Sequence, residues 1–325
     1  MKSTIFAVLV LSCAGGAVWG QETPQPQPAP GLTQQKPATT PSRAQQPGPS
    51  ADSPAAPANS QASPGSPARV IPAAAERHFH QGALSQHDGD TANAIEEYKQ
   101  AIKEYPDYFE AHYNLGCIYL DRKGYTEAIT ELKTAVALRP NDADTHDVLG
   151  LALKHNRDLR GAIFEYQEAL RLNPKLASAQ GNMASALYAQ RDFNGAITHY
   201  RAALVLQPNN AGIHMNMASA LDDAGKPDEA ITEYKEAIRL DPKNASAHYN
   251  LAIVYLKKKD NTSAIAELRQ AAKLSPDWPT PHLMLTNLLK DSDPKAALDE
   301  CVVADGLTND AKLHNLCSDL QKKSQ

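Results

Sequence analysis

A single interval of 34 residues organises most of this chain. Proline recurs at this spacing six times without a break, at Pro106, Pro140, Pro174, Pro208, Pro242 and Pro276. Two alanine series follow the same interval, beginning at Ala94 and at Ala101. Three series in one register indicate a tandem array of a single structural unit, because self-similarity at a period of about 20–50 residues is typical of repeat architectures.

Each unit contains two helical stripes. With the proline placed at position 32, the units begin at Ala75, Phe109, Ala143, Ala177, Ala211, Ala245 and Pro279. Positions 4, 7, 8 and 11 fall on one face of a helix, and positions 20, 24 and 27 form a second stripe. Breakers such as Gly225-Lys226-Pro227 separate the stripes. Each unit is therefore predicted to be a pair of antiparallel helices, with glycine or alanine at position 8 allowing close approach.

The motif resembles the tetratricopeptide repeat (TPR), whose signature places Leu-Gly at 7 and 8, Tyr at 11, Ala at 20 and Pro at 32. Leu115-Gly116, Tyr119, Ala128 and Pro140 match it in one unit. The resemblance implies an all-α fold: a right-handed α-solenoid of about seven helix-turn-helix units over residues 73–310. It also implies a concave groove lined by the first helix of each unit.

The two ends of the array depart from the motif. The first unit carries Gln81 and Ser85 at positions that are otherwise apolar, which is typical of a polar capping repeat. The last unit fits only with one residue deleted, which places Ala297, Cys301 and Ala304 at positions 20, 24 and 27. Residues 311–325 then carry an apolar stripe that predicts a final helix covering the last hairpin.

The N-terminus reads as an export signal. Lys2 precedes an apolar run from residue 5 to residue 11, which is too short to span a membrane. One interpretation is a signal peptide of residues 1–20 that is cleaved before Gln21. The alternative is a lipobox ending at Cys13, which would carry lipid as the first mature residue. Both place the mature chain outside the cytoplasm, periplasmic or secreted, with membrane attachment only if Cys13 is lipidated.

Residues 21–72 are predicted to be a disordered linker. Of the 23 prolines in the chain, 13 lie here, among Ala, Gln and Ser, with almost no large apolar side chains. Such a segment cannot bury enough surface to offset its chain entropy. Its proline density favours extended conformations, so it is expected to act as a semi-stiff tether.

No catalytic, cofactor or metal signature is found in the sequence. It lacks HExxH, GxSxG, phosphate-loop and dinucleotide motifs. Histidine stands at position 4 of six units: His78, His112, His146, His214, His248 and His282. Neighbouring helices lie about 8–10 Å apart, too far for side chains in this register to share one zinc ion. We therefore expect half-buried rings that pack between hairpins, and no catalytic, cofactor-binding or metal-binding residue.

The charge and the cysteines of the chain bear on its possible partners and on its covalent links. The net charge of −5 argues against a nucleic-acid partner, which requires a basic field. Cys301 lies on the last hairpin and Cys317 on the helix after it, so the two can form a disulfide in an oxidising compartment. The alternative is a pair of small buried thiols.

The predicted groove carries a row of amides. If the family geometry holds, positions 2, 5, 6, 9, 12 and 13 line it. The candidate peptide-binding residues stand at positions 5 and 6: Tyr113, Asn114, Asn182, Met215, Asn216, Tyr249 and Asn250. Each Asn side chain offers one acceptor and two donors, which suits the backbone of an extended peptide. The alternative is that Asn at position 6 merely suits the fold.

The sequence thus predicts a non-catalytic protein-interaction scaffold. Its expected partner is another protein, presented as an apolar or neutral peptide or helix, with no small-molecule substrate and no nucleic acid. The basic residues with which some family members clamp a terminal carboxylate are absent, and Glu110 and Asp144 at position 2 would repel one. The alternative is a lipid-anchored envelope-assembly or cell-wall accessory protein, tethered through Cys13.

Overall fold

The structure, a computed structural model, describes residues 70–308 and 310–323. The predicted signal peptide, Cys13 and all but the last three residues of the predicted linker lie outside this range. Every regular element in the described ranges is an α-helix. Their bounds are α1 (Ala73–His87), α2 (Thr91–Glu104), α3 (Phe109–Asp121), α4 (Tyr125–Leu138), α5 (Ala143–His155), α6 (Leu159–Leu172), α7 (Ala177–Ala189), α8 (Phe193–Leu206), α9 (Ala211–Asp223), α10 (Pro227–Leu240), α11 (Ala245–Lys257), α12 (Asn261–Leu274), α13 (Pro279–Leu289), α14 (Pro294–Thr308) and α15 (Ala311–Lys323).

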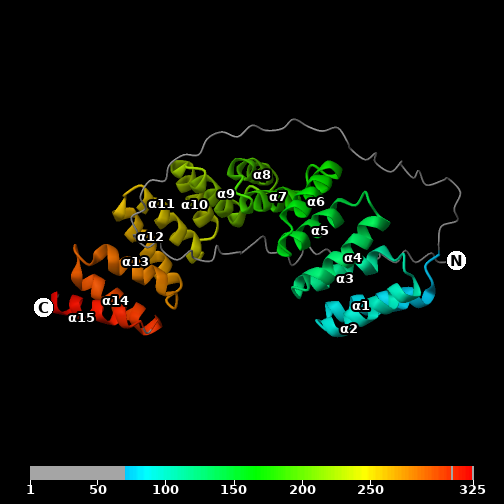
Figure 1. The fold of residues 1–325 in the computed structure, drawn as a ribbon, viewed down its shortest axis with the longest axis horizontal. Coiled ribbons are helices and arrows are strands. Elements are labelled where there is room, and N and C mark those ends of the chain that lie inside the picture. Colours follow the sequence, from blue (N-terminus) through cyan, green and yellow to red (C-terminus); the bar gives the residue numbers. More distant parts are fainter. Residues whose placement is uncertain (1–69, 309, 324–325) are drawn as a thin grey trace, which may run out of the picture. The chain divides into compact units, whose positions relative to one another are not determined.

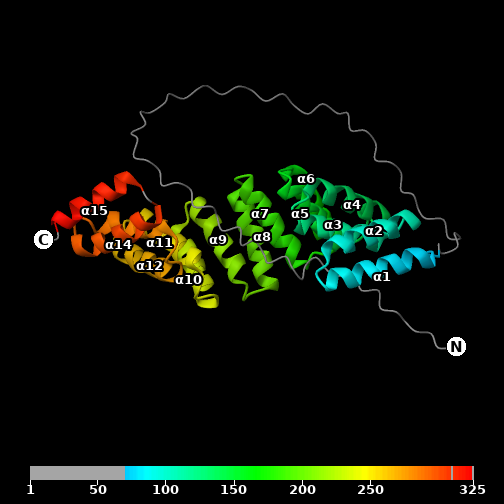
Figure 2. The ribbon, with the colours of Figure 1, turned by 90° about the horizontal axis from the view of Figure 1, so that it is seen from below.

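Consecutive helices pair into hairpins, and the hairpins stack in chain order (Figures 1 and 2). Each odd-numbered helix from α1 to α13 packs mainly against the even-numbered helix that follows it, each pair packs on the next hairpin, and α15 packs on α14. From the second unit onward, every first helix begins at the first position of its unit. The predicted all-α solenoid of helical hairpins is confirmed.

The turn inside each unit has a repeated structure. Position 15 adopts a left-handed backbone, with φ of +62° at Lys123, +66° at Arg157 and +81° at Gly89. The next residue caps the second helix: in α2, α6, α8 and α12 an aspartate side chain accepts a hydrogen bond from the backbone N–H three residues on. Such a cap contributes about 1 kcal/mol, so these turns fix where the second helix starts.

Position 8 is where the two helices of a hairpin approach most closely. A Cβ at Gly150 would lie 2.6 Å from the ring of Tyr166, and one at Gly116 would lie 2.7 Å from Leu132. Tyr166 and Leu132, both at position 24, are completely buried. The large residue at 24 thus occupies the space that the glycine leaves open, as the sequence predicted.

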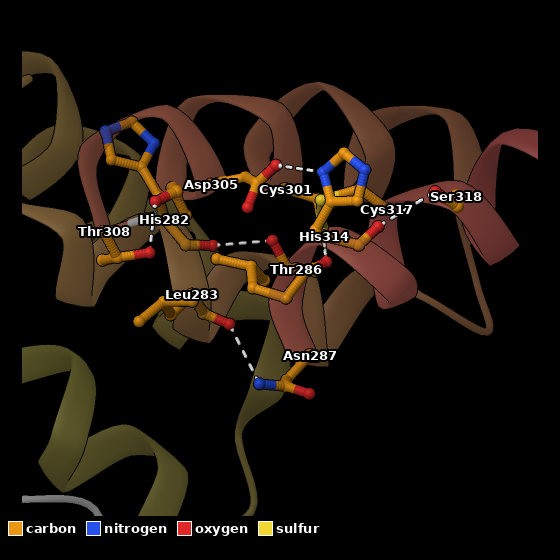
Figure 3. Close-up of a disulfide and its surroundings, with 12 residues drawn as sticks. His282, Leu283, Thr286, Asn287, Cys301, Asp305, Thr308, His314, Cys317 and Ser318 are labelled. Carbon is orange, nitrogen blue, oxygen red and sulfur yellow. Dashed lines mark hydrogen bonds and ion pairs between the residues drawn. A yellow bond between two sulfur atoms is a disulfide. The ribbon is translucent and has the colours of Figure 1, made fainter. Parts of the chain in front are cut away.

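The C-terminal end is closed by a helix and a disulfide. Cys301 of α14 is bonded to Cys317 of α15, with 5.6 Å between their Cα atoms (Figure 3). Leu313 and Leu320 of α15 are buried against the last hairpin. Beside the disulfide, the ring of His314 lies 3.0 Å from an Asp305 carboxylate oxygen, which adds a second link between α14 and α15.

Candidate functional site

Successive first helices lie side by side along the solenoid. Helices α3, α5, α7, α9 and α11 each pack on the next in the series, whereas the second helices of neighbouring units make no comparable contact in the described chain. Several side-chain bonds cross this layer, among them Asn182 Nδ2 to Asp147 Oδ1 at 2.9 Å, Lys154 Nζ to Ser185 Oγ at 3.2 Å, Tyr188 Oη to Asp223 Oδ2 at 2.5 Å, and Lys257 Nζ to Asp222 Oδ2 at 2.6 Å. We call positions 2, 5, 6 and 9 of these five helices the first-helix face.

The asparagine row divides into buried and accessible members. Asn114 is completely buried and donates a hydrogen bond to the hydroxyl of Tyr98 over 3.2 Å. Asn182, Asn216 and Asn250 are half-buried. The Asn182 side-chain amide donates a hydrogen bond to the Asp147 carboxylate. The amides of Asn216 and Asn250 make no hydrogen bond to another described side chain, so they stay available to a ligand.

The three candidates at position 5 differ in the same way. Tyr113 and Met215 are buried, with relative exposures of 4% and 3%. Tyr249 is half-buried and its ring lies 4.7 Å from that of Trp278. The peptide-binding assignment stays a prediction. Of its candidates, only Asn182, Asn216, Tyr249 and Asn250 are accessible enough to contact a ligand without rearrangement.

Small polar residues at positions 2 and 9 belong to the same surface and were missed among the candidates. Ser178, Ser185, Ser219 and Ser246 are all half-buried. Ser219 Oγ lies 2.8 Å from the hydroxyl of Tyr234, so it also ties the first helix to the second. These serines recur with the 34-residue interval, and that register is the signal that could have identified them.

Asp147 is the most perturbed acid of the first-helix face. Burial raises the pKa of its carboxyl to about 6, although hydrogen bonds from Asn182 and Ser178 act in the opposite direction. Burial is the larger cause because the side chain is almost wholly enclosed, with 6% of the residue exposed. Asn182 is therefore a support for Asp147 as well as a candidate contact.

The histidine row has a more specific role than the packing expected from the sequence. Each position-4 ring bonds through Nδ1 to a glutamate on the second helix of its own hairpin, at 2.6–2.7 Å. The expectation that these rings pack between neighbouring hairpins was thus incomplete. The glutamates were missed, although they recur 19 residues after the histidines in five units, at Glu97, Glu131, Glu165, Glu233 and Glu267.

No group of three or more His, Cys, Asp or Glu side chains in the described residues is arranged to hold a metal ion. Within the same ranges, no helix combines the length and the apolar character needed to cross a membrane.

Comparisons with known proteins agree with this architecture. Profiles described as "Tetratricopeptide repeat" match residues 86–151 and 245–278, and one described as "TPR repeat" matches residues 184–223 and 219–259. A search of curated protein sequences finds no match. The chain belongs to the tetratricopeptide repeat family.

Several solved TPR proteins share the fold. A tetratricopeptide repeat protein from Parabacteroides merdae is 16% identical over 76% of this chain and 99% of its own, with a TM-score of 0.58. PilF of Pseudomonas aeruginosa is 21% identical over 66% of this chain and 97% of its own, with a TM-score of 0.55. YrrB, described as a TPR protein with an unusual peptide-binding site, is 20% identical over 59% of this chain and 98% of its own, with a TM-score of 0.51. TPR proteins generally act as protein-interaction scaffolds without catalytic activity of their own.

Proposed function

We propose that this chain is a non-catalytic scaffold that works outside the cytoplasm and holds an extended peptide, or a helix, of a partner protein on its first-helix face. The observation that carries the proposal is the half-buried amide row, in which Asn216 and Asn250 have no partner among the described side chains. Both amides reach solvent, so a ligand exchanges their hydrogen bonds with water for bonds of its own, and each such exchange contributes about 0.5–1.5 kcal/mol.

The composition of the surface favours an uncharged ligand. On α7, α9 and α11 the face carries Ser, Gly, Asn, Met, Tyr and Ile, and no Asp, Glu, Lys, Arg or His. An amide presents both donors and acceptors, as a peptide backbone does, and so can hold main-chain groups with little regard to side-chain sequence. Tyr249, braced by Trp278, offers an aromatic surface for one apolar side chain of the partner.

Capture of the partner by paired variants tests this function. Full-length protein and Asn216→Ala/Asn250→Ala are immobilised and exposed to an extract of the cells that produce the chain. Loss of two amides that bond a ligand directly is expected to weaken retention roughly tenfold or more. Asn182 is left unchanged, because removing it would take a hydrogen bond from buried Asp147.

A matched control comes from the second helices. Thr198 and Thr232 both stand at position 22, are exposed, and bond only to a backbone carbonyl four residues earlier. Thr198→Ala/Thr232→Ala removes two polar groups from the opposite layer and should leave retention unchanged. Equal capture by both double variants and the wild type would rule out the first-helix face as the binding surface.

Export and anchoring are a separate part of the proposal, because their residues lie outside the described chain. We propose export through residues 1–20, with residues 21–72 as a tether. The alternative is a lipid anchor at Cys13, which would make the chain an envelope-assembly or cell-wall accessory protein. Intact mass of the native chain separates the two: unmodified Gln21 at the N-terminus excludes lipidation, and a diacylated Cys13 supports it.

A further inference from the structure

The histidine row joins three segments of the chain at a single ring. In His112, His146 and His214, Nδ1 lies 2.6 Å from a glutamate carboxylate on the second helix. Nε2 of the same rings lies 3.0, 3.1 and 3.0 Å from a backbone carbonyl, that of the proline ending the preceding unit. One imidazole therefore links a first helix, its second helix and the junction with the unit before. We call the His–Glu–proline carbonyl set the histidine clamp.

Both partners of each clamp are hydrogen-bond acceptors. A carboxylate and a backbone carbonyl offer no proton, and a neutral imidazole carries only one N–H. A neutral ring can donate to one of them and must turn a lone pair toward the other. Only the doubly protonated imidazolium satisfies both contacts, and its bond to the carboxylate is then charge-assisted.

We propose that the histidine clamps of the second, third and fifth units make the solenoid respond to pH, holding hairpins and unit junctions together when protonated and releasing one of the two contacts when neutral. The device lies within the fold and does not depend on which ligand the first-helix face binds.

In the fourth unit, the three segments that a histidine clamp joins are linked without a carboxylate. Gln180 stands at position 4 and His199 at position 23, so the order of the two residue types is exchanged. His199 donates from Nδ1 to Gln180 Oε1 over 2.8 Å, and Gln180 donates from Nε2 to the carbonyl of Pro174 over 3.4 Å. An amide carries both a donor and an acceptor, so this arrangement joins the three segments without any charge. Burial lowers the pKa of His199, which favours the neutral form of this ring.

The charged groups around His146 favour its protonated ring. They are Glu165 and Glu168, both on α6. The hydrogen bond with Glu165 is the largest cause that raises the pKa of His146, whereas burial acts against it. Helices α4 and α7 also pack on α5 but present no charged group that acts on this ring among the described residues.

The other two clamps have similar surroundings. His112 faces Glu131 on α4, and His214 faces Glu233 and Glu236 on α10. Glu236 is also paired with Arg239 of the same helix.

The sign of the effect follows from linkage. A histidine whose pKa is raised on folding binds its proton more tightly in the folded chain. Its contribution to stability is complete below the unfolded pKa of about 6.5 and is lost as pH rises through the folded value. Asp147 acts in the same direction, because its raised pKa of about 6 makes the folded state take up a proton as pH falls toward that value. Any test must therefore separate the two.

The experiment transplants the fourth unit's arrangement into the clamps. The reference is the full-length chain carrying Asp147→Asn. This substitution removes the carboxyl whose titration would otherwise add to that of the histidines. The test variant adds His112→Gln/Glu131→His, His146→Gln/Glu165→His and His214→Gln/Glu233→His. Urea unfolding is followed at pH 6.0 and pH 8.5. The reference is expected to have a several-fold larger unfolding equilibrium constant at pH 8.5, and the transplant is expected to lose most of that difference.

A control variant removes histidines that form no clamp. His80 and His87 are exposed on α1, and His80→Gln/His87→Gln should keep the full pH dependence of the reference. An unaltered pH dependence in the transplant would overturn the proposal.

If the triple transplant does not fold, the protonation state of the His146 ring is measured by ¹⁵N NMR in the wild-type protein. Two protonated ring nitrogens at pH 6.5 support the proposal. A ring with a single proton at that pH refutes it.

Discussion

Replacing Gly150 with alanine tests whether close packing of the two helices requires glycine at position 8. The new Cβ would lie 2.6 Å from Tyr166 Cε1 and 2.7 Å from Cδ1, well inside the ordinary carbon–carbon contact of about 3.5–4.0 Å. Because Tyr166 is completely buried, its ring cannot turn into solvent, so α5 and α6 must separate. Overpacking of this kind costs about 1–3 kcal/mol, and alanine recovers about 0.5–1 kcal/mol of helix propensity. We expect a net loss of about 1–2 kcal/mol.

Gly306→Ala provides the matched control for this prediction. Gly306 is also helical, on α14, but a Cβ there meets nothing within 4 Å. Its substitution reports the propensity gain alone and should raise the free energy of unfolding by up to about 1 kcal/mol. Urea unfolding measures both variants, and amide hydrogen exchange locates the loss, because a solenoid need not unfold in one step. A Gly150→Ala protein as stable as Gly306→Ala would refute the close-packing argument.

Two further predictions concern the turns and the C-terminal end. Arg157→Gly should raise the free energy of unfolding by about 0.5–1 kcal/mol, because a non-glycine residue at φ +66° is strained; an unchanged or lower thermal midpoint would contradict this. Cys301→Ser/Cys317→Ser should destabilise the packing of α15 by about 3 kcal/mol, because the bond closes a loop with a sequence separation of 16. Faster amide exchange confined to α14 and α15 is the expected readout, and unchanged exchange there would show that the helix is held by its apolar contacts alone.

The fold could be predicted in detail because a solenoid is nearly one-dimensional. Each unit contacts only its neighbours, so residues 34 apart meet the same surroundings and repeat the same side chains. The missing residue in the last unit shows how closely sequence and structure correspond. His282 pairs with Glu300 at a separation of 18, whereas the other position-4 histidines pair with glutamates at a separation of 19. A single deletion between α13 and α14 therefore leaves the pairing of the hairpin intact.

The candidate site could be predicted only in part, because register does not reveal burial. Asn114 and Asn216 occupy the same repeat position, yet one is enclosed and the other is half-buried. The difference arises in the first units, where an aromatic cluster surrounds the hairpin junction: Phe79 lies 5.5 Å from Tyr98 and 4.9 Å from Tyr108, measured between ring centroids. Tyr98 then takes the Asn114 amide as a hydrogen-bond donor. Such a difference between units cannot be read from a pattern that averages over them.

Positions 4 and 6 separate two tasks on one helix. Successive helical residues are about 100° apart, so the two positions point about 160° from each other around the axis. Histidine at 4 thus faces the second helix of its own hairpin, and asparagine at 6 faces away from it. The fourth unit demonstrates the independence of the two rows, because it replaces the histidine with Gln180 while keeping Asn182. Substitutions in the clamps can therefore alter how firmly the hairpins are joined without changing the residues offered to a ligand. A ligand-binding defect in an Asn216 or Asn250 variant can in turn be interpreted without invoking the clamps.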